Sequence, residues 1–226
     1  MDVQLRAVER TVVITAGETR LSAILGIPRR PLGTVVFAHG SHSGRLSPRN
    51  NSVAHALQDA GLVTLLADLL TESESEDRSL VFDIEFLANR LLLCTKWVQS
   101  RPELRRLPVG YFGASTGAGA ALLAAATCGN SIGAIVSRGG RPDLAGDRLE
   151  AVQAPTLLLA GGNDTQIIEL NEQSLERLSG EKELVIVPGA GHLFEEPGTL
   201  EEVARLARQW FVSHLSKCVG SSMVDR

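Results

Sequence analysis

The stretch from Leu107 to Gly119, LPVGYFGASTGAG, constrains the fold of this chain more than any other. It begins with an apolar run, residues 108–112, that has the length and composition of a buried strand. After a tight turn it enters an alanine-rich segment, residues 118–127, that is typical of a helix. Gly-x-Ser-x-Gly between a strand and a helix is the pattern of a nucleophile elbow. The alternative is that the small residues only let the helix pack closely on the strand.

Ser115 is the central residue of this pattern. A serine on so tight a turn has a strained backbone, and its neighbours two before and two after must be small for strand and helix to approach. Gly113 and Gly117 meet that need. The following helix adds backbone N–H groups and the positive end of its dipole. We therefore predict that Ser115 is a nucleophile.

Length and composition indicate one globular domain. We place it at residues 1–215 of the 226, followed by an irregular tail at 216–226. Hydrophobic residues make up 44% and charged residues 21%, as in ordinary folded domains. The net charge of −4, without a basic cluster, argues against nucleic acid as a partner. Because no apolar run reaches membrane-spanning length and none opens the chain, we expect a cytoplasmic protein with no membrane partner.

The three cysteines, Cys94, Cys128 and Cys218, are an odd number without the spacing of a zinc site. This pattern fits free thiols in a reducing compartment better than a disulfide framework. We therefore expect no metal site.

Apolar runs of strand length alternate with segments of helical spacing along most of the chain, which predicts a doubly wound, mostly parallel α/β sheet. The first two strands form an antiparallel hairpin at its edge. Residues 69–78 form a mobile acidic loop near the site, too short for a large lid. The expected strands are residues 3–15, 20–27, 34–38, 62–67, 108–112, 131–137, 155–160 and 183–187, and the expected helices are 52–60, 79–100, 118–127, 167–178 and 199–215.

Polar side chains follow several of these strands directly. In a parallel sheet the carboxyl ends of the strands meet at one edge, where sites form. The residues at these ends are His39–Ser41, Asp68, Ser115, Arg138, Asp164 and His192. We therefore expect a functional site at this edge.

A serine nucleophile needs a base, and the base needs an orienting acid. On an elbow of this kind the chain order is serine, acid, histidine. We predict His192 as the base, because it sits in a glycine-rich loop after a strand, whereas His214 lies within the last helix. Asp164 is the preferred acid and Asp143 the alternative, although Asp164 also fits an ordinary turn.

Two backbone N–H groups have to stabilise the oxyanion of the reaction. We assign them to Thr116, directly after the nucleophile, and to Ser41, in the loop after the third strand. His39 is expected to shape that loop by hydrogen bonding.

Substrate contacts are expected from His42, Arg45 and Arg138, which lie in loops at the site face. Arginine binds carboxylates bidentately, and Arg138 is the best candidate because it is nearest a strand end. The alternatives are that His42 faces solvent and that most of the loop arginines pair with acidic residues. Those acidic residues are Glu72, Glu74, Glu76 and Asp143.

Together these residues resemble the α/β-hydrolase superfamily, in its dienelactone hydrolase-like branch with small carboxylesterases. The resemblance rests on residues 113–117, Asp164, His192 and the His-Gly-Ser of residues 39–41, and it extends over residues 8–215. Dienelactone hydrolases proper carry a cysteine nucleophile, so Ser115 is a departure that points to a serine carboxylesterase.

The resemblance implies hydrolysis of small soluble esters through an acyl-enzyme. This chemistry needs no cofactor and no metal. The partner is then a small-molecule ester, and the protein is expected to be a monomer or a homodimer. Two alternatives remain open, a peptidase or other acyl hydrolase on the same fold and a slow-turnover ligand sensor.

Overall fold

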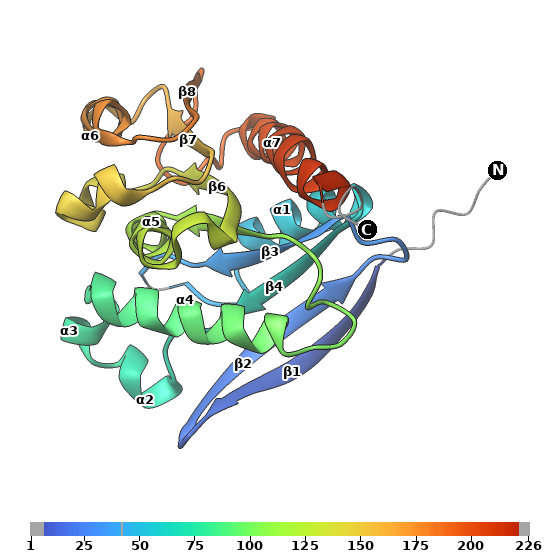
Figure 1. The fold of residues 1–226 in the computed structure, drawn as a ribbon. Helices are drawn as coiled ribbons and strands as arrows, with labels where there is room; N and C mark the ends of the chain where they lie inside the picture. The colour runs from blue at the N-terminus through green and yellow to red at the C-terminus, as the bar shows by residue number, and fades with distance from the viewer. Residues whose placement is uncertain (1–6, 42, 222–226) are drawn as a thin grey trace.

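The computed structural model describes residues 7–41 and 43–221. Eight strands in these residues form one sheet in the order β1-β2-β4-β3-β5-β6-β7-β8 (Figure 1). β1 pairs antiparallel with β2 and β2 with β4, and every other pair is parallel. The mostly parallel sheet and its N-terminal hairpin are thereby confirmed. The strands are β1 (Val8–Ala16), β2 (Thr19–Ile27), β3 (Gly33–Ala38), β4 (Leu62–Ala67), β5 (Val109–Ala114), β6 (Ile132–Arg138), β7 (Thr156–Gly161) and β8 (Lys182–Val187).

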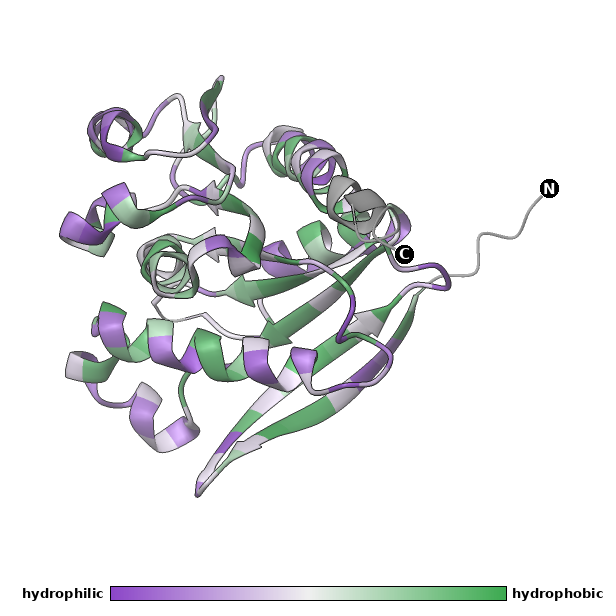
Figure 2. Ribbon diagram, viewed as in Figure 1, coloured by the Kyte–Doolittle hydropathy of each residue, from purple (hydrophilic) through white to green (hydrophobic). Residues whose placement is uncertain are grey.

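Helices cover both faces of the sheet. One hydrophobic cluster lies between the sheet and α4 and α5, and a second lies between the sheet and α1 and α7. All residues of β3, β4, β5 and β7 are buried, as their apolar runs predict, and the central strands are mainly hydrophobic in Figure 2. The helices are α1 (Pro48–Asp59), α2 (Glu72–Ser75), α3 (Arg78–Val81), α4 (Ile84–Gln99), α5 (Thr116–Cys128), α6 (Thr165–Arg177) and α7 (Thr199–Ser221).

The acidic segment 69–78 is not the loop that its composition suggested. Thr71 and Glu74 form a capping box that starts the short helix α2, and Glu74 also forms an ion pair with Arg90 of α4. The helix expected at 79–100 is divided into α3 and α4, because Asp83 caps a new helix start with its side chain. Phe82 therefore lies exposed at the break and not in the core.

Two helix boundaries differ from the expectation by four residues or more. α1 begins at Pro48, four positions before Ser52, because Ser47 accepts a hydrogen bond from the Asn50 N–H and proline is favoured in the first turn. α7 continues to Ser221, so residues 216–221 are helical and not an irregular tail. The sequence has no regular apolar spacing after Leu215, which is why the helix was predicted to end there.

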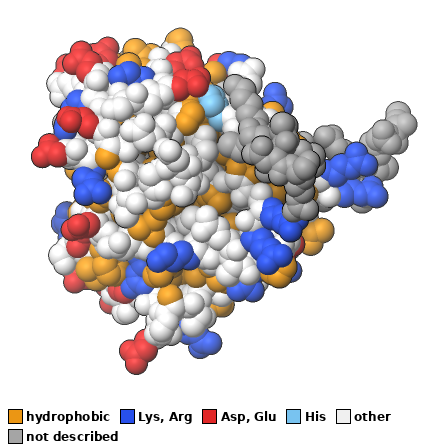
Figure 3. All heavy atoms as spheres, in the orientation of Figure 1, with side chains coloured by type: hydrophobic (Ala, Val, Ile, Leu, Met, Phe, Trp, Pro, Cys, Tyr) orange, Lys and Arg blue, Asp and Glu red, His pale blue; other side chains and the backbone are white. Residues whose placement is uncertain are grey.

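No helix in the described part of the chain is long and apolar enough to cross a membrane. The face in Figure 3 carries acidic and basic side chains interspersed with uncharged surface. The parallel strands β3, β5, β7 and β8 end at the same edge of the sheet, and the loops that follow them carry the candidate residues.

Candidate active site

The elbow places Ser115 between β5 and α5 with φ 51° and ψ −124°, one of two positive φ values at non-glycine residues in the described chain. The strain persists because the neighbouring glycines allow close packing. A Cβ atom at Gly117 would lie 2.1 Å from the carbonyl oxygen of Ala38, and one at Gly113 would lie 2.5 Å from the Cα of Ala118. Both glycines are therefore required sterically, and the strand–turn–helix context matches the sequence pattern.

His192 connects Ser115 to Asp164. Its Nε2 lies 3.4 Å from the Oγ of Ser115, and its Nδ1 lies 2.7 Å from Oδ2 of Asp164. Because an ionised carboxylate only accepts, Nδ1 donates to Asp164 and the neutral ring presents the Nε2 lone pair to the serine. The side chain of Asp164 is 16% exposed and that of His192 is 39% exposed. The three residues predicted from the sequence therefore lie together, and the His192 side chain is partly exposed.

Asp164 occupies the N-cap position of α6, yet its side chain makes no capping hydrogen bond there. An aspartate at this position normally accepts an N–H of the first turn. Here the carboxylate turns to His192 instead, which costs the helix a cap and gives the imidazole its orienting partner. The turn explanation for Asp164 therefore does not account for its side chain.

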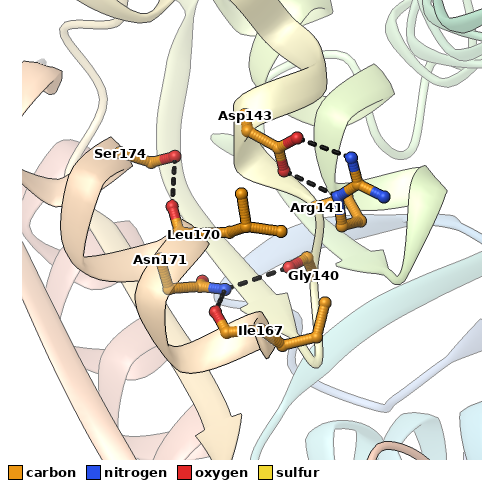
Figure 4. Close-up of polar contacts among 7 residues, drawn as sticks. All are labelled: Gly140, Arg141, Asp143, Ile167, Leu170, Asn171 and Ser174. Carbon is orange, nitrogen blue, oxygen red and sulfur yellow. Dashed lines mark hydrogen bonds and ion pairs between the residues drawn. The ribbon is translucent and has the colours of Figure 1, made fainter. Parts of the chain in front are cut away.

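Asp143, the alternative acid, is committed elsewhere. Both of its carboxylate oxygens accept hydrogen bonds from Arg141, at 2.8 and 2.7 Å (Figure 4). This pairing is one of those that the sequence left open for the loop arginines. The same view contains Asn171 of α6, whose buried Nδ2 donates to the carbonyl oxygens of Gly140 and Ile167. Asn171 thus fixes α6, which follows Asp164, to the turn after β6.

The proposed oxyanion donors adjoin each other. The backbone N–H of Ser41 donates to Oγ1 of Thr116 at 3.0 Å, and Thr116 is the first residue of α5. Hydrogen bonding therefore brings the loop after β3 directly against the elbow. The N–H groups of a first helical turn lack partners within the helix, which leaves the Thr116 N–H available for a ligand. The side chain of Thr116 is a contact that the sequence reasoning did not assign.

His39 shapes the Ser41 loop, as expected. Its Nε2 accepts a hydrogen bond from the Leu69 N–H at 2.9 Å, so Nδ1 carries the proton and donates to the carbonyl oxygen of Gly40 at 3.0 Å. Burial lowers the pKa of His39 below its ordinary value. A neutral His39 thus joins the loop after β3 to the end of β4.

The three candidate substrate contacts have different outcomes. Arg45 forms an ion pair with Asp68, and its backbone N–H donates to Oδ1 of the same carboxylate at 2.7 Å, so its charge is already neutralised. Arg138 is buried and makes no ion pair with any residue that the structure describes. His42 lies outside the described residues. Arg45 therefore pairs with an acid that the sequence had not named for it.

The loop that carries His192 is held by residues that the sequence analysis missed. Glu196 accepts the Gly191 N–H at 3.0 Å, and backbone hydrogen bonds of this kind lower the pKa of Glu196. Phe194 is fully buried with φ 55°. Glu195 pairs with Arg49 of α1 at 2.6 Å. The adjacent Glu195 and Glu196 were the sequence feature that could have indicated these contacts, but the partner of Glu195, Arg49, is distant in the sequence.

A polar cavity of about 770 Å³ borders the Ser41 loop on the side of β2 and α2. Hydroxyl and charged groups dominate its wall, including Ser22, Ser43, Thr71, Ser75 and Arg20, while Leu70, Val81 and Leu87 are its apolar members. Because its wall includes Gly40 and Ser41, a group bound in the cavity would lie next to the proposed oxyanion donor Ser41.

Other chemistry-bearing residues lie apart from this site. Among the described residues, no group of three or more histidine, cysteine or acidic side chains is arranged to hold a metal ion. Burial raises the pKa of Cys94 to about 12, and His214 packs against Trp210 within α7. Neither residue takes part in the arrangement around Ser115.

Comparison with known proteins gives a consistent family. The model of the dienelactone hydrolase family matches residues 21–214. The crystal structure of a dienelactone hydrolase from Anabaena variabilis is 53% identical, with a TM-score of 0.91, and the match covers 93% of this chain and 99% of that one. Est1E from Butyrivibrio proteoclasticus is 15% identical with a TM-score of 0.79, over 91% of this chain and 99% of that one, and shares the fold.

A curated relative from Mycobacterium tuberculosis is 55% identical over 207 residues, and it is provisionally named a phosphoribosyl transferase. The match covers 92% of this chain but 47% of that protein, so the chain spans about half the length of the curated relatives it matches. The name phosphoribosyl transferase refers to those longer proteins as a whole. Over its matched residues 21–214, this chain belongs to the dienelactone hydrolase family of α/β hydrolases.

Proposed function

We propose that this protein is a serine hydrolase that cleaves small soluble carboxylic esters. The observation that carries the proposal is the hydrogen-bonded series from Asp164 through His192 to Ser115, with contacts of 2.7 and 3.4 Å. Serine hydroxyls become nucleophilic when an oriented imidazole accepts their proton, and this series has that order and those atoms.

In the first half of the reaction the Oγ of Ser115 attacks the ester carbonyl carbon while its proton passes to Nε2 of His192. The carbonyl oxygen becomes negative and is stabilised by the N–H groups of Thr116 and Ser41, and the Ser41 N–H turns from Oγ1 of Thr116 to the oxyanion. Collapse of this intermediate breaks the bond to the alcohol oxygen, which takes the proton from His192. The alcohol leaves, and the acyl group remains on Ser115 as an ester.

In the second half a water molecule replaces the alcohol. His192 removes a proton from the water as its oxygen attacks the acyl carbon, and the same two N–H groups stabilise the new oxyanion. When the bond to Ser115 breaks, Nε2 returns the proton to Oγ and the carboxylic acid is released. Asp164 keeps the ring in one tautomer throughout and stabilises the imidazolium.

Two features support small polar esters over aggregated lipid. The segment between β4 and α4 contains only the short helices α2 and α3, which are too small to form an extensive lid. The cavity beside Ser41 is lined mainly by hydroxyl and charged groups, and it would favour a polar part of the substrate. The expected partner is accordingly a small-molecule ester.

Turnover of short-chain aryl esters tests the proposal. The wild-type protein should hydrolyse 4-nitrophenyl acetate, and Ser115→Ala should lose on the order of 10³-fold or more in kcat, because the nucleophile is removed. Full turnover by Ser115→Ala would refute the role of the serine. Rapid labelling by a fluorophosphonate without appreciable turnover would favour the ligand sensor.

A further inference from the structure

The guanidinium group of Arg138 is a buried positive charge with no counter-ion in the described structure. The residue is 7% exposed, and its Nε and Nη1 atoms are buried without a hydrogen-bond partner. Arg45, Arg49 and Arg141, the other arginines of the site loops, each pair with a carboxylate. Arg138 is therefore the exception among the arginines around the candidate active site.

An unpaired buried charge is costly, so a structure usually provides it with a partner. Burial, and to a smaller extent the positive charge of Arg49, lower the pKa of Arg138 to about 10. The guanidinium nevertheless keeps its proton at neutral pH. It thus presents a desolvated cation whose Nε and Nη1 donors have no acceptor among the described residues, which is the condition under which an anion is bound strongly.

The position of Arg138 joins this charge to the catalytic residues. Its carbonyl oxygen accepts the backbone N–H of Ser115 at 3.2 Å. The next residue, Gly139, packs so closely that a Cβ atom there would lie 2.8 Å from the carbonyl oxygen of His192. Arg138 therefore lies immediately beneath the nucleophile and the base.

The strand geometry gives the direction of the side chain. Side chains alternate along β6, which puts Arg138 on the same face as Ala134 and Val136. Both pack in the cluster beneath α1 and α7. Arg49, in the first turn of α1, is near enough to lower the pKa of Arg138. The nearby Glu195 forms its ion pair with Arg49 and not with Arg138. The charge thus faces the amino end of α1 and the loop that follows His192.

We propose that Arg138 binds an anionic group of the ester substrate, a carboxylate or a phosphate, on the α1 side of Ser115. The planar fork of arginine matches both groups bidentately. Arg49 and the first turn of α1 add positive potential from the same side. This inference rests on the proposed function and narrows its substrate class to esters that carry a negative charge beyond the scissile bond.

Matched substrates test the inference directly. The test measures kcat/KM of wild type, Arg138→Met and Arg138→Lys for three esters. These are 4-nitrophenyl hydrogen succinate, the 4-nitrophenyl ester of phosphonoacetic acid and the neutral methyl 4-nitrophenyl succinate. Arg138→Met should lower kcat/KM for an anionic ester by about 10- to 100-fold, as for the loss of a charged hydrogen bond, and change the neutral ester less than about twofold. Arg138→Lys should keep part of the preference because it keeps the charge.

The two anionic esters distinguish a carboxylate from a phosphonate. The ester whose kcat/KM falls more in Arg138→Met carries the group that the subsite prefers. Arg177→Met is the matched control, because it removes the same charge from the last residue of α6, where Arg177 pairs with Asp147. Equal losses for anionic and neutral esters, or equal effects of Arg138→Met and Arg177→Met, would overturn the inference. Hydrolysis of the neutral ester by wild type keeps this outcome distinct from failure of the proposed function.

A binding measurement is independent of turnover. Succinate or inorganic phosphate should raise the Tm of wild type and of Ser115→Ala, but not that of Arg138→Met. Arg138→Met should itself fold with an unchanged or higher Tm, because methionine replaces an unpaired buried charge with an apolar chain of similar length. A ligand-induced shift of the same size in Arg138→Met would contradict the assignment.

Discussion

Asp164 stands at the N-cap of α6 but gives its carboxylate to Nδ1 of His192, 2.7 Å away. The residue thereby forgoes a stabilising contact with its own helix for one with a loop far along the chain. An arrangement of this kind is expected where orientation of the imidazole matters more than helix stability.

Asp164→Asn should separate these two roles. The amide has the shape of the carboxylate, but it can donate to Nδ1 and so favour the wrong tautomer of His192. We expect kcat for an aryl ester to fall by about 10³- to 10⁴-fold, with Tm unchanged or slightly raised because asparagine is a good N-cap. Steady-state kinetics and thermal unfolding measure both effects.

Asp143→Asn is the control for that substitution. It removes one charge from the carboxylate that Arg141 holds, and it should change kcat less than about threefold, as is usual for surface substitutions away from the reacting groups. A large loss in Asp143→Asn together with an active Asp164→Asn would reverse the assignment of the acid.

Thr116→Val should weaken catalysis without weakening substrate binding. Valine keeps the size and the branched shape of threonine but removes the Oγ1 atom that accepts the Ser41 N–H. Because misplacing an oxyanion donor costs part of its effect, we expect kcat to fall about tenfold with little change in KM. Thr116→Ser retains the hydroxyl and should keep most of the activity, so similar losses in both variants would argue against this role.

His39 should make the stability of the protein depend on pH below neutrality. Its pKa is lowered in the folded state from the ordinary value of 6.5, so below that pH the unfolded chain binds more protons. The free energy of unfolding therefore receives the full contribution of neutral His39 above the unfolded-state pKa. It loses this contribution as the pH falls towards the folded-state pKa.

Urea unfolding between about pH 8 and about pH 5 measures this effect by comparing wild type with His39→Gln, whose side-chain oxygen can accept the Leu69 N–H. The stability advantage of wild type should shrink as the pH decreases. An advantage that stays constant or increases on acidification would show that His39 does not titrate as a buried neutral group.

Gly117→Ala should destabilise the elbow severely. The added Cβ would meet the carbonyl oxygen of Ala38 at 2.1 Å, so backbone has to move, and we expect a loss of about 3 kcal/mol or more. Gly129→Ala is the matched control, since it has nothing within 4 Å and should cost only the left-handed backbone penalty of about 1–2 kcal/mol. Chemical denaturation measures both, and equal losses would show that steric contact at the elbow is unimportant.

Much of the site was accessible from the sequence because parallel strands bring their ends together. Ser115, Asp164 and His192 each follow a strand, so their meeting depends on strand order and needs no knowledge of side-chain conformation. The sequence alone favoured Asp164 over Asp143 as the acid. The pairing of both Asp143 carboxylate oxygens with Arg141 depends on side-chain conformation, which the sequence does not determine.

Features that depend on partners distant in the sequence were not accessible. The capping box of Thr71 and Glu74 is local, but acidic composition obscured it in a segment that was expected to be a loop. The contact between Glu196 and Gly191 depends on how the loop closes, and the lone charge of Arg138 depends on which neighbours are already paired. Pairing of this kind is a property of the packed structure and leaves no pattern in the chain.

Nucleophilic attack by Ser115 is tested most directly by the intact mass of the protein after acid quenching during turnover of 4-nitrophenyl acetate, followed by peptide mapping. We expect wild type to gain the mass of one acetyl group on Ser115 and Ser115→Ala to gain none. An acetyl group mapped to any other residue during productive turnover, or ester hydrolysis by Ser115→Ala at the wild-type rate, would contradict it.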